Sequence, residues 1–370
     1  MSDDIGVVYY LLSVVKSLSF LSDEKKPELI ILYAANCKKF IDEFNYEYLT
    51  KSEIEYNSNK KLKYLLSFIL QTNLFVNPII KKYKLDGIFP LMDAPVRSAF
   101  STCVVASWIP DFQHKFYPEF FTKKNLLLRE TRFKKILSNT NAVFLSSNDA
   151  HSHLKQFYNP KTVKSKIVVM PFVSMIKDTK LPAEAELVKK YNITKPYFLV
   201  SNQFYAHKNH IVVLNAIKEL KEKGYDFTVY MTGKTEDYRN PLFYGTLTGF
   251  IEENDISNEA KILGLIPRED QLGLLRNALS VIQPSKFEGW STIIEDAKTF
   301  GVQVICSDID VHKEQMGERA FYFKPDSAND LSVIMQSFLN HNYTPKSIFN
   351  NYNERIEHFA SAFLSTFTRK

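Results

Sequence analysis

The sequence predicts an α/β protein whose parallel sheets are divided between two domains. Short runs of β-branched and aromatic residues alternate with segments of helical period almost throughout, the pattern of parallel sheets covered by helices on both faces. The chain has 370 residues, more than one hydrophobic core normally serves. With 45% hydrophobic and 24% charged residues, the composition is that of a folded protein with an ordinary polar surface.

The predicted strands are too numerous for one comfortable doubly wound sheet. Between most of them lie apolar residues three and four apart, as in the helix that runs from Ile211 to Leu220 and ends near Gly224. The predicted strands are Leu29–Tyr33, Gly87–Leu91, Cys103–Trp108, Ala142–Ser146, Lys166–Met170, Tyr197–Ser201, Phe227–Thr232, Lys261–Leu265, Leu279–Gln283, Gln303–Ser307 and Ala320–Phe323.

A linker is predicted within Val173–Lys190, where Asp178, Pro182 and several charges interrupt the pattern. It divides the chain into an N-terminal domain, residues 1–172, and a C-terminal domain, residues 173–349. The end of the chain, about Ser347 to Phe367, is predicted as a helix that packs back on the first domain.

The chain is apolar from Gly6 to Val15. This stretch is too short, and the residues after it are too polar, to span a membrane. It has no basic leader or cleavage site of a signal peptide. We expect a helix packed in a core, with an interfacial membrane helix as the alternative. The cysteines, Cys37, Cys103 and Cys306, are far apart, so neither a disulfide framework nor a zinc site is predicted, and a cytoplasmic location fits.

Ligands of open parallel sheets bind beyond the carboxyl ends of the strands, where loops and helix N-termini converge. Glycine is scarce, 11 residues in all, yet Gly233, Gly264 and Gly289 fall at or just beyond predicted strand ends in the second half. The C-terminal domain is therefore the predicted ligand-binding domain.

The segment Gln283–Gly301 is predicted as strand, tight loop and helix. It places Glu288 in the loop and Glu295, seven positions later, on the first turn of the helix. The helix N-terminus, from about Ser291, offers N–H groups to a phosphate. An alternative for Glu295 is a capping box, because Thr292-x-x-Glu295 fits that pattern.

This segment resembles the retaining glycosyltransferases of family 4, whose donor motif is Glu-x7-Glu on the two-Rossmann GT-B scaffold, with two domains facing across a cleft. The flanking segments Leu263–Leu272, Cys306–Glu314 and Phe323–Asp326 are also similar to the family. The resemblance implies that Glu288 binds donor sugar hydroxyls and Glu295 the ribose. It also implies diphosphate contacts from Gly289, Ser291 and Thr292, and places Leu265 beside the base.

A second segment, Val200–Asn209, follows a strand and opens a helix. In the family this loop carries Gly-Arg and then a Lys, two cations that offset the leaving diphosphate. Lys208 matches the lysine, whereas Asn202 or Gln203 stands at the arginine. The alternative for Lys208 is an exposed lysine at a helix start, which is unfavourable unless an anion lies nearby.

In the first domain, Trp108–Phe121 is similar to the acceptor-side loop of bacterial relatives. Asp111 matches an aspartate of that loop, Pro110 stands where a histidine is often found, and His114 follows three residues later. The resemblance implies catalytic roles for Asp111 and His114; a structural histidine is the alternative.

Other features point to partners less directly. The net charge of +6 favours an anionic partner, such as a nucleotide diphosphate or an acidic lipid. The basic stretch Lys123–Lys135 is either a solvated helix face or a surface for a phospholipid or pyrophosphate-linked acceptor. His207 and His210 lack a third ligand, so no metal or cofactor is expected, and no nucleic-acid partner is expected either.

The start of the chain departs from the family, whose members begin with a strand and a Gly-Gly loop. Here a helix is expected soon after Met1–Gly6, with Gly6 as a remnant of the loop. Either the first strand is missing, and a partner protein supplies it, or the domain is built differently.

The function implied by the resemblance is retaining transfer of a sugar from a nucleotide-diphosphate sugar to a glycan or lipid-linked acceptor, in surface polysaccharide synthesis. Peripheral contact with the inner face of the membrane is an accompanying option. The alternatives are a non-catalytic or partner-dependent nucleotide-sugar-binding member of the fold, and a sugar-nucleotide epimerase.

Overall fold

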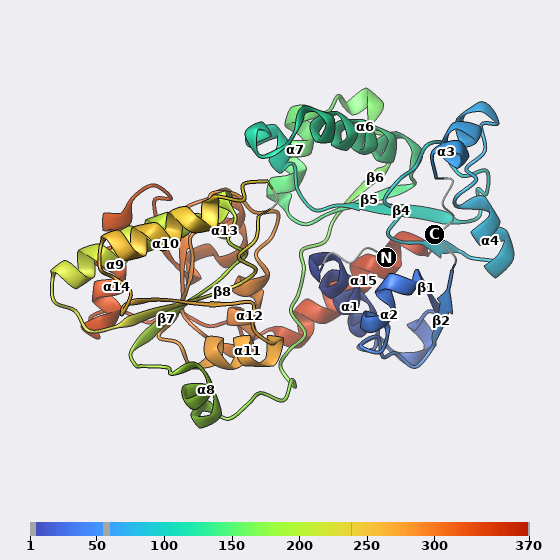
Figure 1. Ribbon diagram of the computed structural model, residues 1–370. Coiled ribbons are helices and arrows are strands. Elements are labelled where there is room, and N and C mark those ends of the chain that lie inside the picture. The colour runs from blue at the N-terminus through green and yellow to red at the C-terminus, as the bar shows by residue number, and fades with distance from the viewer. Residues whose placement is uncertain (1–4, 55–59, 238, 369–370) are drawn as a thin grey trace. The chain divides into compact units, whose positions relative to one another are not determined.

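The computed structural model describes residues 5–54, 60–237 and 239–368 (Figure 1). Two compact units make up the chain. One comprises Ile176–Asn350, and the other comprises the residues up to Met175 together with those from Asn351 onward.

The C-terminal unit is built on a six-stranded sheet in which every neighbouring pair is parallel, with the order β12-β11-β10-β7-β8-β9. From β7 the chain steps outward to β9, returns to β10 beside β7, and steps outward again to β12. This is the strand order of the dinucleotide-binding Rossmann sheet. Its strands are β7 (Tyr197–Ser201), β8 (Thr228–Thr232), β9 (Ala260–Gly264), β10 (Ser280–Gln283), β11 (Val304–Ser307) and β12 (Phe321–Phe323).

Helices cover both faces of this sheet, because strand residues alternate between two apolar cores. In β7, Phe198 and Val200 pack in the core with α9, α10 and α14, whereas Tyr197 and Leu199 pack in the core with α8, α11 and α12 (Figure 1). The helices of the unit are α8 (Glu184–Tyr191), α9 (His210–Glu222), α10 (Phe243–Glu253), α11 (Arg268–Asn277), α12 (Thr292–Phe300), α13 (Asp310–Met316) and α14 (Ala328–Leu339), with short 3-10 turns η5 (Ala206–Lys208) and η6 (Gly317–Arg319).

The N-terminal unit contains two sheets of parallel strands. The larger has the order β3-β4-β5-β6 and the smaller pairs β1 with β2. The strands are β1 (Leu29–Tyr33), β2 (Leu49–Glu53), β3 (Gly87–Ile88), β4 (Val104–Ile109), β5 (Ala142–Leu145) and β6 (Lys166–Val169). The helices among them are α2 (Lys38–Ile41), α3 (Lys60–Ile69), α4 (Asn77–Tyr83), α5 (Gln113–Phe116), α6 (Lys123–Asn139) and α7 (Asn148–Phe157).

The first and last helices, α1 (Ile5–Leu18) and α15 (Tyr352–Phe367), pack against each other in this unit. Tyr10 of α1 stacks on Trp108 of β4 at a centroid distance of 4.0 Å, and meets the ring of Phe359 edge-on. The apolar start of the chain is thus packed in a core. Among the described residues, no helix is long and apolar enough to cross a membrane.

The structure confirms the α/β class and the predicted strands, with differences at their ends. β3 stops at Ile88 because Pro90 has no N–H to donate to a ladder. Leu49–Glu53 was not predicted as a strand, since its polar sequence and mostly exposed residues give no apolar run. The predicted linker is shorter than expected, because α8 begins at Glu184. Gly6 lies in α1 rather than in a loop, and Met1–Asp4 lie outside the described residues.

Candidate active site

The loops after β7 and β10 meet at the point where the strand order of the C-terminal sheet reverses. Ligands of such sheets bind at this point because the helices that follow the two strands lie on opposite faces of the sheet, which leaves a crevice at the strand ends. Asn202 directly follows β7 and Gln283 ends β10, and the Asn202 side-chain amide donates to Gln283 Oε1 at 2.6 Å. Both side chains are buried, so a polar cluster lies at the centre of the sheet edge.

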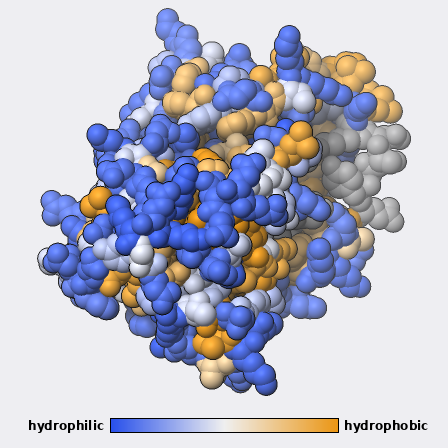
Figure 2. Space-filling model, turned by 60° about the vertical axis from the view of Figure 1, so that its left-hand side comes forward, coloured by the Kyte–Doolittle hydropathy of each residue, from blue (hydrophilic) through white to orange (hydrophobic). Residues whose placement is uncertain are grey.

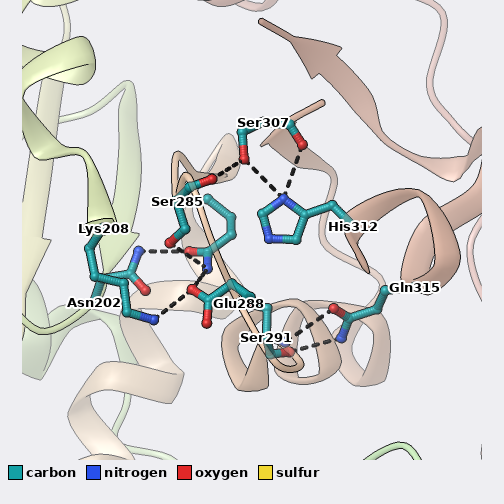
Figure 3. A network of polar contacts seen from close by, with 9 residues as sticks. Asn202, Lys208, Ser285, Glu288, Ser291, Ser307, His312 and Gln315 are labelled. Carbon is teal, nitrogen blue, oxygen red and sulfur yellow. Dashed lines mark hydrogen bonds and ion pairs between the residues drawn. The ribbon is translucent and has the colours of Figure 1, made fainter. Parts of the chain in front are cut away.

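The same two loops supply an ion pair next to this amide pair (Figure 3). Lys208 Nζ lies 2.5 Å from Glu288 Oε1, and Gln283 Nε2 donates to the same oxygen at 2.9 Å. The side chains of Lys208 and Glu288 are only 17% and 9% exposed. Glu288 is therefore the anion beside Lys208, and a phosphate bound here would compete with this carboxylate for the ammonium.

The backbone before α9 fixes the position of Lys208. Lys208 ends the short turn η5, and Asn209 follows in the left-handed region with φ of 56°. The Asn209 side-chain amide donates to the carbonyls of Pro284 and Pro325 at 3.1 and 2.7 Å. An asparagine suits this position because it tolerates the left-handed conformation and carries a donor.

The N-terminus of α12 lies in the same cluster. Gln315 of α13 donates to the Ser291 carbonyl at 2.8 Å and accepts from the Ser291 N–H at 3.3 Å. Ser291 is the N-cap but makes no side-chain cap bond, and its buried hydroxyl has no hydrogen-bond partner among the described residues. A buried hydroxyl at a helix N-terminus is suited to an anionic ligand.

Glu295 does not form a capping box, because the N-cap is Ser291 and Thr292 is already the first helical residue. The Glu295 carboxylate, 1% exposed, accepts from Lys298 Nζ at 2.7 Å and from Gln315 Nε2 at 2.9 Å. Both residues lie on α12, and Gln315 connects them to α13, because its side chain donates to Glu295 and its carbonyl oxygen accepts from Lys298 Nζ at 3.4 Å.

The spacing of the two glutamates differs from the motif that they resemble. Glu-x7-Glu has seven residues between its glutamates, whereas six lie between Glu288 and Glu295, so Asp296 stands at the second position. Asp296 is buried and pairs with Arg268 Nη2 at 2.7 Å. Arg268 begins α11, close in sequence to Leu265, which is 69% exposed directly after β9. Sequence reasoning missed Asp296, although the motif's spacing could have identified it.

A second residue that sequence reasoning missed is His312 of α13, which is fully buried. Its Nδ1 lies 3.0 Å from the Ser307 carbonyl oxygen and 3.1 Å from the Ser307 hydroxyl, which itself donates to the Ser285 carbonyl (Figure 3). Burial lowers the pKa of His312 to about 4, although the charge of Glu288 opposes the shift. The ring is therefore neutral, and its proton is on Nδ1, because Nδ1 faces a carbonyl oxygen that can only accept. Nε2 has no partner among the described residues.

The remaining donor-side residues lie around this cluster. Gln203 is exposed while Asn202 is buried, so Asn202 is the inner of the two residues that could match the arginine of the family. Thr292 is exposed at the start of α12, and Gly289 is half-buried in the loop before it. At Gly233, φ is 148° and a Cβ would lie 2.0 Å from the Asn202 carbonyl oxygen. Only glycine allows the loop after β8 to approach Asn202 this closely.

In the N-terminal unit, Asp111 and His114 are both turned toward α6. Asp111 Oδ1 accepts from Arg129 Nη2 at 2.7 Å and from the Gln113 N–H at 2.9 Å. His114 is buried, with Nε2 3.4 Å from Glu130 Oε2. Burial and the Arg129 charge lower its pKa to about 4.

The basic stretch of α6 is largely engaged within the unit. Arg129 binds Asp111, Lys134 pairs with Glu130, and Lys135 binds the Tyr64 hydroxyl. His207 and His210 of the other unit do not belong to a metal cluster: across the described ranges, no group of three His, Cys, Asp or Glu residues is arranged to hold an ion.

Comparisons with known proteins agree with this architecture. Residues 184–355 match the model of the family described as glycosyl transferases group 1. A glycosyltransferase from Rickettsia africae ESF-5 is 18% identical with a TM-score of 0.63, and the match covers 98% of this chain and 90% of that one. Anabaena HepE, solved with UDP and glucose, is 13% identical with a TM-score of 0.63, covering 99% and 92%.

WaaG, a glycosyltransferase involved in lipopolysaccharide biosynthesis, is 11% identical with a TM-score of 0.59, and the match covers 95% of this chain and 90% of that one. No curated protein sequence matches the chain. At these identities the solved structures define the fold. The chain thus has the GT-B fold of two Rossmann-like domains, and its C-terminal unit matches the glycosyl transferases group 1.

Proposed function

We propose that this protein is a glycosyltransferase that moves a sugar from a nucleotide-diphosphate sugar to a glycan or lipid-linked acceptor, with retention at the anomeric carbon. The observation that carries the proposal is the Lys208–Glu288 pair at the switch point of a Rossmann sheet. It lies within the residues that match the glycosyl transferases group 1. The UDP and glucose named for HepE support this class of donor.

The donor diphosphate would bind at Lys208 and at the N-terminus of α12. Gly289, Ser291 and Thr292 belong to that helix end and the loop before it, and Lys208 pairs with Glu288 of the same loop. Charge that develops on the leaving phosphate would be stabilised by the ammonium and the helix dipole, without a divalent metal. Glu288, released from Lys208, would accept hydrogen bonds from sugar hydroxyls.

We assign the nucleoside to the side of α12 that faces α11. Leu265 would lie beside the base, as the family resemblance implies. For the ribose we prefer Asp296 to Glu295, because Asp296 has the spacing of the motif and pairs with Arg268 near Leu265. Glu295 is turned toward α13 instead.

On the acceptor side, Asp111 and His114 stay candidate catalytic residues of the N-terminal unit. The lipopolysaccharide role named for WaaG supports a surface polysaccharide or its lipid-linked precursor as acceptor. Such an acceptor would place the protein in the cytoplasm, at the inner face of the membrane.

The test compares wild type with Glu288→Ala and Lys208→Ala in donor binding and in transfer or donor hydrolysis. A thermal-shift panel of UDP-, GDP-, ADP- and dTDP-sugars first identifies the donor, since specific binding stabilises the native state. Lys286→Ala is the matched control, because Lys286 lies in the same loop but pairs with the exposed Asp326. Wild-type turnover in both site variants would contradict the proposal.

A non-catalytic, partner-dependent nucleotide-sugar-binding protein is the second candidate. It is favoured by the uncharged Asn202 and Gln203 where the family has arginine, and by Pro110 in the acceptor loop. Nucleotide binding without turnover for any acceptor would support it. A sugar-nucleotide epimerase would instead yield free nucleotide-sugar with an isomerised sugar.

A further inference from the structure

Helix α3 of the N-terminal unit exposes the apolar side that an amphipathic helix normally buries. Leu62, Leu65, Leu66 and Ile69 follow the spacing of one helical stripe, and they are 54%, 57%, 37% and 66% exposed. Their neighbours Phe68 and Leu70 are 51% and 58% exposed. Six large apolar side chains therefore meet solvent along one short segment.

The opposite side of α3 is polar and attached to the unit. The Ser67 hydroxyl is buried; it donates to the Lys63 carbonyl at 2.8 Å and accepts from the Leu74 N–H at 3.2 Å. Lys135 of α6 binds the Tyr64 hydroxyl at 2.5 Å, and its Nζ lies 5.3 Å from the centre of the Phe68 ring. These contacts fix the helix with its leucines outward, so the exposure belongs to the folded unit.

The sequence on both sides of this apolar stripe is basic. Residues 56–85 contain six lysines and no aspartate or glutamate, and Lys61, Lys81 and Lys82 are exposed. On the face drawn in Figure 2, hydrophobic residues gather at the upper right, whereas much of the remaining surface is hydrophilic. Exposed apolar side chains flanked by lysines match the apolar interior and the negative head groups of an anionic lipid surface.

We infer that α3 is a membrane-docking helix that lies in the head-group region of an anionic phospholipid bilayer, with Leu62, Leu65 and Ile69 inserted and the flanking lysines on the lipid phosphates. The 10 residues of α3 are far too few to cross a bilayer, so the helix lies in the plane of the surface. A second copy of the chain fits this face less well, because two lysine-rich surfaces repel each other. The inference is independent of the proposed transfer reaction.

Flotation of the full chain with vesicles tests this inference. We expect wild type to bind vesicles of phosphatidylcholine and phosphatidylglycerol, to bind phosphatidylcholine alone about tenfold less, and to lose binding in high salt. The variant Leu62→Gln/Leu65→Gln/Ile69→Gln should lower binding about tenfold or more, and Lys61→Glu/Lys81→Glu should do the same.

Matched controls come from the other unit. Leu242→Gln/Val333→Gln removes similarly exposed apolar side chains, and Lys189→Glu/Lys223→Glu reverses exposed lysines; both should bind as wild type does. Unchanged thermal unfolding verifies that each variant is folded. Equal vesicle binding by the α3 variants and the controls would overturn the inference. The inference would also be overturned if wild type formed a dimer in the absence of lipid and the glutamine variant were a monomer.

Discussion

The ammonium of Lys208 lies 2.5 Å from a carboxylate oxygen of Glu288, although 80 positions separate the two residues in the chain. The contact exists because β10 lies beside β7 in the sheet, which brings the loops after both strands together. In the proposed function the cation would bind phosphate and the carboxylate would bind sugar, so the two roles meet in one ion pair.

Substitutions of the two partners should therefore affect nucleotide affinity differently. Lys208→Met removes the cation, and we expect the dissociation constant for the matching nucleoside diphosphate to rise about 10- to 100-fold, the effect of losing a charge-assisted hydrogen bond. Glu288→Gln removes the competing anion, so the affinity for the same nucleotide should be unchanged or higher, whereas sugar transfer should fall.

Isothermal titration calorimetry with nucleoside diphosphate measures both effects. Lys286→Met and Glu318→Gln are the controls, because the first lies in the same loop and the second is exposed. A weaker affinity in Glu288→Gln, equal to that of Lys208→Met, would mean that the pair acts as one structural unit and does not compete with phosphate.

The two neighbouring carboxylates of α12 give a second prediction. Asp296→Asn should weaken binding of the nucleoside diphosphate by about tenfold, the scale of one lost hydrogen bond to a charged group. Glu295→Gln should weaken it much less, because its carboxylate faces Lys298 and Gln315. Calorimetry with nucleoside diphosphate and with the corresponding 2′-deoxynucleotide locates the effect at the ribose.

If Glu295→Gln weakened nucleotide binding more than Asp296→Asn, the ribose contact would be assigned to Glu295. Both variants alter buried ion pairs, so their unfolding free energies have to be measured alongside. The Asp296→Asn variant keeps the shape of the side chain and retains an acceptor for Arg268, which limits the structural cost.

The buried His312 should make the protein sensitive to acid. Its pKa is about 4 in the folded protein and about 6.5 in an unfolded chain, so the unfolded state binds the proton more tightly. The stability associated with neutral His312 is fully present above about pH 6.5 and is lost as the pH falls toward 4, by about 3 kcal/mol. His312→Gln should flatten the dependence of unfolding free energy on pH in this window.

Urea unfolding between pH 4 and pH 7 measures this dependence. His341→Gln, at an exposed position, is the control and should leave the slope as in wild type. The pKa of His114 is also lowered to about 4 by burial. Because His114 lies in the other unit, its substitution should flatten the pH dependence of the unfolding free energy of that unit. An unaltered slope in His312→Gln would contradict the buried neutral state.

Much of the fold could be predicted because the strands of both units are apolar runs bounded by turns. β7, β8 and β10 are buried at nearly every residue, so their sequences could be little else. β2 could not be predicted, because four of the five residues of Leu49–Glu53 are polar and the strand pairs only with β1 in a two-stranded sheet. Propensity gives no signal where pairing, and not burial, defines the strand.

The loops that carry the candidate site could be predicted from the sequence, but the contacts between their side chains could not. Glu288 and Lys208 follow strands, and the rule for strand ends selects them from the sequence. Their pairing, and the joint contact of Gln315 with Ser291 and Glu295, depend on which strands and helices are neighbours. The contact of His312 with Ser307, five residues earlier at the end of β11, depends on how α13 turns back over the strand that precedes it.

Gly233 offers a test of how tightly the loops of the site are fitted. Gly233→Ala should destabilise the C-terminal unit by about 2–4 kcal/mol, because φ is 148° and the new Cβ would meet the Asn202 carbonyl oxygen at 2.0 Å. Gly224→Ala is the matched control: φ is 79°, but no atom lies within 4 Å of the new Cβ. It should cost only about 1 kcal/mol, the strain of the left-handed backbone. Urea unfolding measures both, and nucleotide affinity should fall in Gly233→Ala alone, because its backbone shift moves Asn202 away from Gln283. Equal destabilisation by the two alanines would show that the loop after β8 can relax away from Asn202.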